Sequence, residues 1–579
     1  MRKIVRNLGG LVINPKRKIG HIKKSMELRK NRKLYNEQYR VWLADQKYSV
    51  VPKKGPKISI LMPTYNTDIV HLIECIESVQ NQTYKNWELC IADDCSTDAR
   101  VYEILVSMSK HDSRIKIKKL DKNGHICKAT NEAFGLATGK YISLLDHDDI
   151  LDKHALAEVV TAINKNKDAG LIYTDEDKLD KLGKHIDPFF KPDFSPYFLR
   201  SCNYITHFTT IRSDLFKKVG GFRLGTEGAQ DWDLILRVSE ISKQVIHIPK
   251  MLYSWRMSDT STASNSDSKP YAYINQKIVL RDHMQRLGIA ASVKSSPYAG
   301  LWNVFNHLNG EPMVSIIIPS KDSYILIKNC LKSIFNQTSY SNFEVIIVDT
   351  GTTVKKCLSL HKEYKNKFPN RFNVVYQKGK FNFSKACNLG AKHSKGNFIL
   401  FLNNDTKIIS NSWLEYLITL AQQPEVGAVG GKLFYAKDLI QHIGVHVNID
   451  DVAHHSCINT DEKVLPDIMI YSSNIRECTA VTGACLMIDR NKFNKVGGFD
   501  EKLRVTYNDV DLCLKLISSG YKNIFTPYAK LFHYESKSVG KIGTNNRDKS
   551  EYFEAKNIVI ERWGEHLSEE KYFKNIFRS

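Results

Sequence analysis

The sequence predicts an α/β protein with two tandem Rossmann-like domains, each built on a mostly parallel sheet, and a basic helical leader in front of them. The chain of 579 residues is longer than one hydrophobic core usually organises. It also repeats itself, because the segment PKISILMPTYN from Pro56 returns as PMVSIIIPSKD from Pro312. Within each repeat, short apolar segments alternate with amphipathic ones. Strands joined by crossover helices form mostly parallel sheets covered on both faces.

The leader, residues 1–55, concentrates positive charge. Residues 1–40 contain thirteen Lys or Arg and two acidic residues, which gives about half of the net charge of +22. A basic amphipathic segment suits an anionic membrane surface, and a solvated, partly disordered tail is the alternative. The rest of the chain has no basic-aromatic stripe, so nucleic acid is not an expected partner. The apolar residues of the leader recur at helical spacing, at Ile4, Leu8, Leu11 and Val12 and at Ile19, Ile22 and Met26.

The first domain, residues 56–290, reads as alternating strands and helices. A strand leads through a loop with Pro63 to an amphipathic helix whose apolar face runs from Ile69 to Val79. The pattern continues with strands over 87–94, 115–120, 141–145 and 169–174 and with helices over 125–137 and 154–163.

The second domain, residues 312–579, repeats this order. Residues 291–311 contain Pro297, Gly300 and Gly310, which predicts a linker between the copies. The correspondence holds at one constant offset, with Pro63, Glu88 and Asp93 matched by Pro319, Glu344 and Asp349.

Acidic residues follow two predicted strands of the first domain. Asp93 and Asp94 end one strand, and Asp146, Asp148 and Asp149 follow another. Ligands of open α/β sheets bind beyond the carboxyl ends of the strands, and oxygen ligands there suit Mg²⁺ or Mn²⁺. Taken alone, the DHDD segment is equally well explained by a helix N-cap, with Asp149 or Asp152 as the capping residue.

Other signals narrow the class of protein. No glycine-rich dinucleotide or P-loop fingerprint accompanies the acids, which counts against a redox enzyme or a nucleotide triphosphatase. The twelve cysteines are scattered without a C-x-x-C pair, which favours reduced thiols. We find no secretory leader and no apolar run long enough to span a bilayer, so the sequence predicts a cytoplasmic protein.

Several motifs in the first copy, in family order, resemble the inverting nucleotide-sugar glycosyltransferases of family two, which have the A-type fold. They are PTYN, DDCS, NGH, DHD, GAQDWDLILR and YSWR, and the resemblance runs from about Lys57 to Ser264 and again from about Met313 to Gly564. It implies a metal-dependent enzyme with Asp148 as metal ligand and Asp231 as catalytic base. An exposed acid at a helix start is the alternative for Asp231, and a structural role is the alternative for Arg256. The implied donor-binding residues are Pro63, Thr64, Asn66, Asp93, Asp94, Asn123, Asp146 and Arg256.

The second copy keeps part of this set. Thr350 replaces Asp94, and FLNND leaves Asp405 as the acid at the metal position. His533 stands where the family has a late metal ligand, and Ser254 occupies the equivalent neighbourhood of the first copy. The resemblance further implies Asp509 as base and Pro319 and Asp349 as donor contacts, so we expect two active domains over one active domain with a scaffold.

The tandem arrangement most resembles bacterial enzymes of O-antigen and rhamnose-containing polysaccharides. This implies transfer from dTDP-rhamnose onto a growing lipid-linked glycan at the inner face of the plasma membrane, with Mg²⁺ or Mn²⁺ as cofactor. Residues 1–40 would hold the protein peripherally on that membrane. Two alternatives stay open: a bifunctional polymerase that alternates two UDP-sugars, and a glycan-binding scaffold of degenerate transferase domains.

Overall fold

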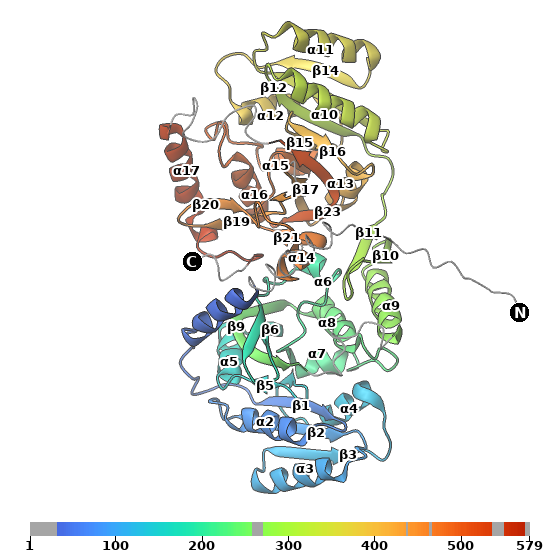
Figure 1. The fold of residues 1–579 in the computed structure, drawn as a ribbon, viewed down its shortest axis with the longest axis vertical. Helices are drawn as coiled ribbons and strands as arrows, with labels where there is room; N and C mark the ends of the chain where they lie inside the picture. Colours follow the sequence, from blue (N-terminus) through green and yellow to red (C-terminus); the bar gives the residue numbers. More distant parts are fainter. Residues whose placement is uncertain (1–31, 258–269, 436–437, 463–465, 535–548, 574–579) are drawn as a thin grey trace, which may run out of the picture.

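A computed structural model of the protein describes residues 32–257, 270–435, 438–462, 466–534 and 549–573. Two α/β domains are stacked along the long axis, with the first in the lower half of Figure 1 and the second in the upper half. Most of the leader, residues 1–31, lies outside the described residues.

The first half of the chain contains these elements: β1 (Ile58–Thr64), α2 (Ile69–Gln80), β2 (Trp87–Asp93), α3 (Ala99–His111), β3 (Ile115–Lys119), α4 (His125–Phe134), β4 (Tyr141–Leu144), β5 (Ile150–Leu151), α5 (Ala155–Lys165), β6 (Ala169–Leu179), β7 (His185–Phe189), α6 (Pro196–Leu199), β8 (Thr210–Arg212), α7 (Ser213–Lys218), α8 (Gln230–Ile241), β9 (Gln244–Arg256), α9 (Pro270–Arg286), β10 (Ala291–Ser295) and β11 (Trp302–Asn306).

The second half contains these elements: β12 (Val314–Ser320), α10 (Tyr324–Gln337), β13 (Phe343–Asp349), α11 (Lys355–Lys367), β14 (Phe372–Tyr376), α12 (Phe383–Lys392), β15 (Phe398–Leu402), β16 (Thr406–Ile408), α13 (Trp413–Ala421), β17 (Val426–Phe434), β18 (Ile440–His442), β19 (Val445–Asn448), β20 (Val452–His455), α14 (Pro466–Ser473), β21 (Arg476–Cys478), β22 (Cys485–Asp489), α15 (Arg490–Lys495), α16 (Asn508–Ser518), β23 (Lys522–His533) and α17 (Lys549–Leu567).

The two main sheets have the same strand order. The first is β3-β2-β1-β4-β8-β6-β9-β5, with β7 paired to β6, and the second is β14-β13-β12-β15-β22-β17-β23-β16, with β18 paired to β17 and β21 to β23. In the first sheet, β1 to β4 pair in parallel, as do β6 and β9, while β5, β7 and β8 run antiparallel. The predicted pair of mostly parallel sheets is confirmed.

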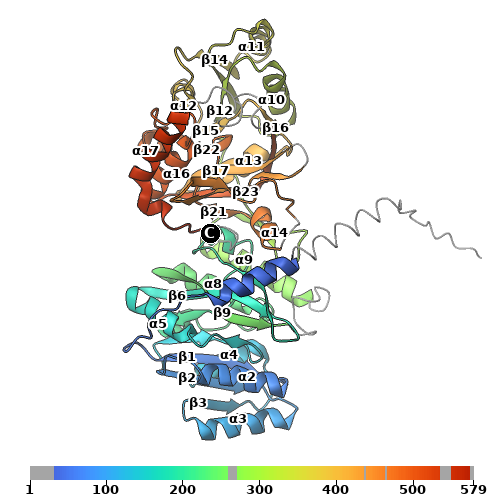
Figure 2. The same cartoon turned by 60° about the vertical axis from the view of Figure 1, so that its left-hand side comes forward.

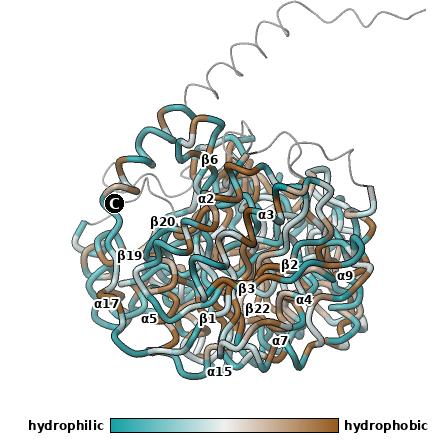
Figure 3. Tube along the Cα trace, turned by 90° about the horizontal axis from the view of Figure 1, so that it is seen from below, coloured by the Kyte–Doolittle hydropathy of each residue, from teal (hydrophilic) through white to brown (hydrophobic). Residues whose placement is uncertain are grey.

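Buried strands and amphipathic helices explain these layers. Every residue of β1 and β12 is buried, as expected for central strands covered on both faces. Helix α2 buries Leu72, Cys75, Ile76 and Val79, and its N-cap Asp68 accepts hydrogen bonds from the Val70 and His71 amides. Hydrophobic and hydrophilic residues alternate along the outer helices in Figure 3, as in helices that cover a sheet.

Part of the predicted leader belongs to the first domain. Residues 32–44 form a helix, dark blue in Figure 2, that lies along the first domain. Tyr39 is fully buried, its hydroxyl donates to Asp177, and the Trp42 ring packs edge-on against Phe190 with centroids 5.0 Å apart. This packing ties the end of the leader to the fold.

The predicted linker contains a β-hairpin. Strands β10 and β11 pair antiparallel, and Trp302 is buried with its indole N–H donating to Gln276 at 2.9 Å. On its other side, Phe305 packs on Tyr416 and Tyr528 of the second domain, with centroids 5.5 and 4.7 Å apart. The hairpin therefore contacts both domains.

The domains also meet directly. The segment around α6 packs on β21, where the Ser195 hydroxyl and the Tyr197 amide donate to the buried Glu477 carboxylate. Phe198 stacks on Tyr471 with centroids 5.6 Å apart. One cluster of buried apolar residues includes members of both domains, so the interface is continuous with the cores.

Two further findings concern the whole described chain. None of the described helices has both the length and the apolar composition needed to cross a bilayer. All twelve cysteines lie within the described residues, and all are free thiols.

Candidate active site

The first domain has a large cavity at the carboxyl end of its parallel strands. Its volume is about 990 Å³. The walls come from the ends of β1 and β4, the starts of α4 and α8, the first turns of α9 and the turn of the β10–β11 hairpin. This is the edge at which open α/β sheets bind ligands.

Most residues that the sequence analysis selected in the first copy meet at this cavity. Asp94 is almost fully buried, and its carboxylate accepts a hydrogen bond from the Gly124 amide at 2.7 Å. The selected residues that line the cavity are Pro63, Thr64, Asp94, Asn123, Asp146, Asp148 and Asp231.

Three selected residues do not line the cavity. Asp93 is fully buried and its carboxylate accepts hydrogen bonds from Ser96, so it stabilises the turn after β2. The Asn66 side chain accepts from the Thr97 amide at 2.8 Å in the adjacent loop. The Arg256 guanidinium donates to the Asp148 carbonyl at 2.9 Å and to Glu74 at 2.6 Å, which anchors the loop after β4.

Asp231 lies in the first turn of α8 and faces the cavity. The Asn203 amide donates to its carboxylate at 2.8 Å. Burial, with a smaller contribution from the charge of Asp146, raises the pKa of Asp231 above its ordinary value. A carboxylate whose proton affinity is raised in this way is suited to accept a proton.

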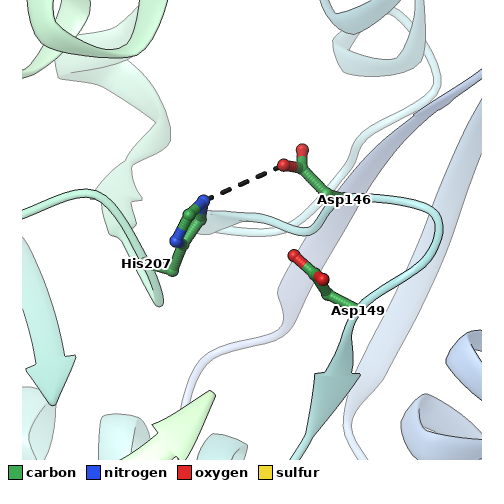
Figure 4. A group of neighbouring side chains, drawn as sticks. All are labelled: Asp146, Asp149 and His207. Atoms are coloured by element: carbon green, nitrogen blue, oxygen red, sulfur yellow. Dashed lines mark ion pairs between the residues drawn. The ribbon is translucent and has the colours of Figure 1, made fainter. Parts of the chain in front are cut away.

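Three side chains beside the cavity can share one cation. Oxygen atoms of Asp146 and Asp149 and a ring nitrogen of His207 all lie within 4.8 Å of one another. Figure 4 shows His207 pointing at Asp146, with 3.8 Å between Nε2 and Oδ2. Asp148 lines the same cavity outside this group, with its side chain 31% exposed. Carboxylate oxygens with one imidazole nitrogen are suitable ligands for Mn²⁺ or Mg²⁺.

The sequence analysis did not select His207. It is one histidine in the segment ITHFTT, outside every motif, and only the tertiary structure brings it to the acids. Its Nδ1 lies 3.3 Å from Glu176, and its ring stacks on Tyr253 with centroids 4.5 Å apart. Burial opposes a charged imidazole, but the charges of Glu176 and Asp146 outweigh burial and raise the pKa of His207 to about 9.

Asp149 belongs to the site and does not cap a helix. It is fully buried, and it accepts hydrogen bonds from the Tyr253 hydroxyl and from the Arg256 amide at 2.8 Å. Burial, followed by the charge of Asp146, raises the pKa of Asp149 well above its ordinary value. Near the start of α5 it is Asp152 that accepts from a backbone amide, that of His154 at 2.7 Å.

The second domain brings Asp405 and His533 together. Both are buried, and His533 Nε2 lies 3.1 Å from Asp405 Oδ1. Asp509 lies in the first turn of α16, where its carboxylate accepts from the Gly483 amide at 2.8 Å. Pro319 lies in β12, and Asp349 ends β13 and accepts from the Gly351 and Thr352 amides at 2.9 and 2.7 Å.

Strand register shows which residues of the two copies correspond. Leu61 pairs with Leu144, and Ile317 pairs with Phe401, so Asp148 corresponds to Asp405. By the same count, Asp149 corresponds to Thr406.

In the antiparallel ladders that follow, Ile150 pairs with Ser254, so Asp149 lies opposite Trp255. Thr406 pairs with His533. The counterpart of His533 is therefore Trp255, next to Ser254, which the sequence analysis placed in this neighbourhood.

Comparisons with known proteins agree with this architecture. The model of the glycosyl transferase family 2 matches residues 59–220 and 315–497. An uncharacterised protein of Sinorhizobium fredii is 39% identical over 526 residues, which cover 89% of this chain and 57% of that protein. An O-antigen biosynthesis protein of Myxococcus xanthus is 36% identical over 485 residues, 84% of this chain and 38% of that protein. The chondroitin synthase of Escherichia coli is 30% identical over 254 residues, 44% of this chain and 36% of that protein. The chain thus spans only part of the length of each relative.

Proposed function

Because this chain belongs to glycosyl transferase family 2, we propose that it transfers a sugar from a nucleotide-sugar donor, with inversion, onto a growing lipid-linked cell-surface polysaccharide. The observation that carries the proposal is the cavity of the first domain. It gathers Asp94, Asp146, Asp148 and Asp231 at one sheet edge, where a diphosphate, a cation and an acceptor hydroxyl can meet.

The side chains divide into roles by position. Asp94 and Asn123 hold the nucleoside, and Pro63 and Thr64 at the end of β1, where the sequence predicted a loop, contact it. Asp231 accepts the proton of the attacking hydroxyl, which typically contributes about 10²- to 10⁴-fold in rate. Asp148 and Asp146 hold Mg²⁺ or Mn²⁺, and a bound cation of this kind stabilises the charge of the departing diphosphate. In the second domain, Asp405 with His533 and Asp509 take the corresponding roles.

The donor we propose is dTDP-rhamnose. The similarity to an O-antigen biosynthesis protein supports a role in polysaccharide assembly. The similarity to a chondroitin synthase favours a second candidate, a polymerase that alternates two UDP-sugars, one for each domain.

A donor panel tests the two candidates. The purified chain is incubated with Mn²⁺ or Mg²⁺, a glycan acceptor and single or paired donors, and release of nucleoside diphosphate is measured. We expect release of nucleoside diphosphate when dTDP-rhamnose is the single donor in the reaction. Release only when two different UDP-sugars are present would instead establish the polymerase. No release with any donor would favour the scaffold.

We also propose that the leader holds the protein on the anionic inner face of the plasma membrane. The charge of residues 1–40 supports this. Since residues 32–44 pack on the first domain, the informative deletion is 1–31. It should weaken sedimentation with anionic vesicles while sparing transfer to a soluble acceptor, and unchanged sedimentation would contradict the proposal.

A further inference from the structure

The two domains differ in where an imidazole approaches the acids. In the second domain His533 comes from the end of β23 and lies 3.1 Å from Asp405. In the first domain the corresponding position in β9 holds Trp255, whose indole side chain has no lone pair with which to coordinate a divalent metal ion.

A different element supplies the imidazole of the first domain. His207 precedes β8 and reaches the same acids from the neighbouring strand. Its ring centroid lies 6.2 Å from that of Trp255, so it occupies the space beside the position that holds histidine in the second domain.

The second domain lacks the counterpart of His207. Tyr141 pairs with Arg212, and Phe398 pairs with Asp489, which aligns β8 with β22. Counting back along both strands places Ala484 at the position of His207. Each domain therefore has one histidine beside its strand-end acids at a position where the other domain has a different residue.

The surroundings of His207 orient it as a ligand. Glu176 lies 3.3 Å from Nδ1, on the side of the ring away from Asp146, and Nε2 faces Asp146 at 3.8 Å. A cation bound between Nε2 and Asp146 would displace the Nε2 proton and leave the Nδ1 hydrogen directed at Glu176. A carboxylate behind an imidazole is the usual support of a metal-binding histidine. Lys191 is fully buried, donates to Glu176 at 2.8 Å and also donates to the His207 carbonyl, so both partners are fixed.

We propose that His207 is the nitrogen ligand of the divalent cation in the first domain. It adds to the carboxylates of Asp146 and Asp148, and the buried Asp149, which lies in one group with His207 and Asp146, supplies a further oxygen. The two copies would thus take their histidine ligand from different strands, the first from the segment before β8 and the second from the end of β23. This inference rests on the proposed function for the presence of a cation, and it assigns the ligands of this chain.

Mn²⁺ binding to the full chain tests the proposal without any donor. Calorimetric titration should find two Mn²⁺ sites in the wild type. His207→Ala should weaken one site at least 10-fold and leave the other, and His533→Ala should do the converse. Glu176→Gln should weaken the first site by about 10- to 100-fold, as for other partners that support a metal ligand. His125 lines the same cavity outside the cation group, so His125→Ala is the matched control and should bind like the wild type.

A spectroscopic measurement separates ligation from a loss of folding. In the His533→Ala background, pulsed electron paramagnetic resonance of bound Mn²⁺ should detect a coordinated imidazole nitrogen, and His207→Gln should remove that signal. Two unchanged sites in His207→Ala, or a nitrogen signal that persists in His207→Gln, would overturn the assignment. Absence of Mn²⁺ binding in the wild type would overturn both this inference and the metal dependence of the proposed function. If no donor is turned over, the proposed function fails, but the Mn²⁺ titration still tests whether His207 is a metal ligand.

Discussion

At the scale of single residues, Asp231 and Asp509 occupy corresponding first turns but have different partners. Asp231 receives a hydrogen bond from the side-chain amide of Asn203 and another from the backbone amide of Trp232. Asp509 receives backbone hydrogen bonds from Gly483 and Val510, at 2.8 and 2.9 Å. If both act as bases, their substitutions should each remove transfer from one domain only.

We predict that Asp231→Asn lowers transfer by the first domain about 10²- to 10⁴-fold, because the amide cannot accept the hydroxyl proton. The donor Kd should change little, since Asp231 is not proposed to contact the nucleotide. Asp509→Asn is the parallel test for the second domain. Steady-state kinetics with each donor, beside direct donor binding, provides the measurement. Full transfer in the double variant would exclude both residues as bases.

Motif order was sufficient to select the four aspartates that line the cavity, but it missed Glu176, Glu227 and His207. Asp94, Asp148 and Asp231 stand in segments whose strand-end or helix-start position is visible in the sequence, and all three line the cavity. His207 carries no such signal, because its role depends on which strand of the sheet lies beside β4. For the same reason the sequence located the counterpart of His533 only as the neighbourhood of Ser254, since strand pairing and not spacing along the chain identifies it as Trp255.

At the scale of elements, one buried glutamate joins three segments in each copy. Glu88 accepts from the Ser59 hydroxyl at 2.6 Å and from the Thr138 amide at 2.5 Å. Glu344 accepts from the Ser315 hydroxyl and from the Lys395 amide, both at 2.7 Å. In both copies this connects two neighbouring strands, β1 and β2 or β12 and β13, to the turn before β4 or β15. The turn approaches closely, and a Cβ on Gly139 would lie 2.7 Å from the Lys57 carbonyl oxygen.

We predict that Glu88→Gln destabilises the protein at neutral pH and less so in acid. Burial would raise the pKa of Glu88, but Lys116 and hydrogen bonds from Ser59 and Thr138 outweigh burial and lower it to about 2. Because the folded pKa lies below that of the unfolded chain, about 4.3, the stabilisation is complete above that pH and is lost as the pH falls toward 2.

Urea denaturation between pH 7 and pH 3 measures this effect. The difference in midpoint between wild type and Glu88→Gln should be largest at neutral pH and shrink below about pH 4.3. Glu103→Gln changes an exposed acid of α3 and should leave the midpoint unchanged. A difference that grows as the pH falls would contradict the prediction.

At the scale of the whole molecule, the N-terminal halves of the two domains point away from each other, and their C-terminal halves are in contact. Strands β3 and β14, which hold corresponding places in the two sheets, lie at opposite ends of the molecule (Figure 1). The halves that contain β6, β9, β17 and β23 meet in the middle. Since the apolar cores join there through Phe198 and Tyr471, we expect the domains to unfold together.

We predict one thermal transition for the wild type and two for Phe198→Ala. Removal of a buried aromatic ring typically costs about 3 to 5 kcal/mol, and this ring contributes to the contact between domains. Differential scanning calorimetry is the measurement. Phe216→Ala removes a ring buried inside the first domain, against Phe134 and Phe222, and should lower Tm while keeping one transition. Two transitions already present in the wild type would contradict the prediction.

Fold class was predictable at this scale because repetition and strand-helix alternation are properties of long segments. The role of residues 291–311 was not, since Pro297, Gly300 and Gly310 indicate turns whether a segment is a free tether or a packed hairpin. Only the burial of Trp302 and the contacts of Phe305 distinguish these cases.

That hairpin determines how the chain can be dissected. Ala299 and Gly300, at its turn, form part of the cavity wall of the first domain, and Tyr528 of the second domain donates a hydrogen bond to Asn303 at 2.5 Å. A truncation at residue 290 would open this cavity on one side, because Ala299 and Gly300 would be missing from its wall. We therefore expect fragments divided at residue 290 to be less active than the intact protein. A fragment that keeps the cavity wall of the first domain has to extend through Asn306, the end of β11.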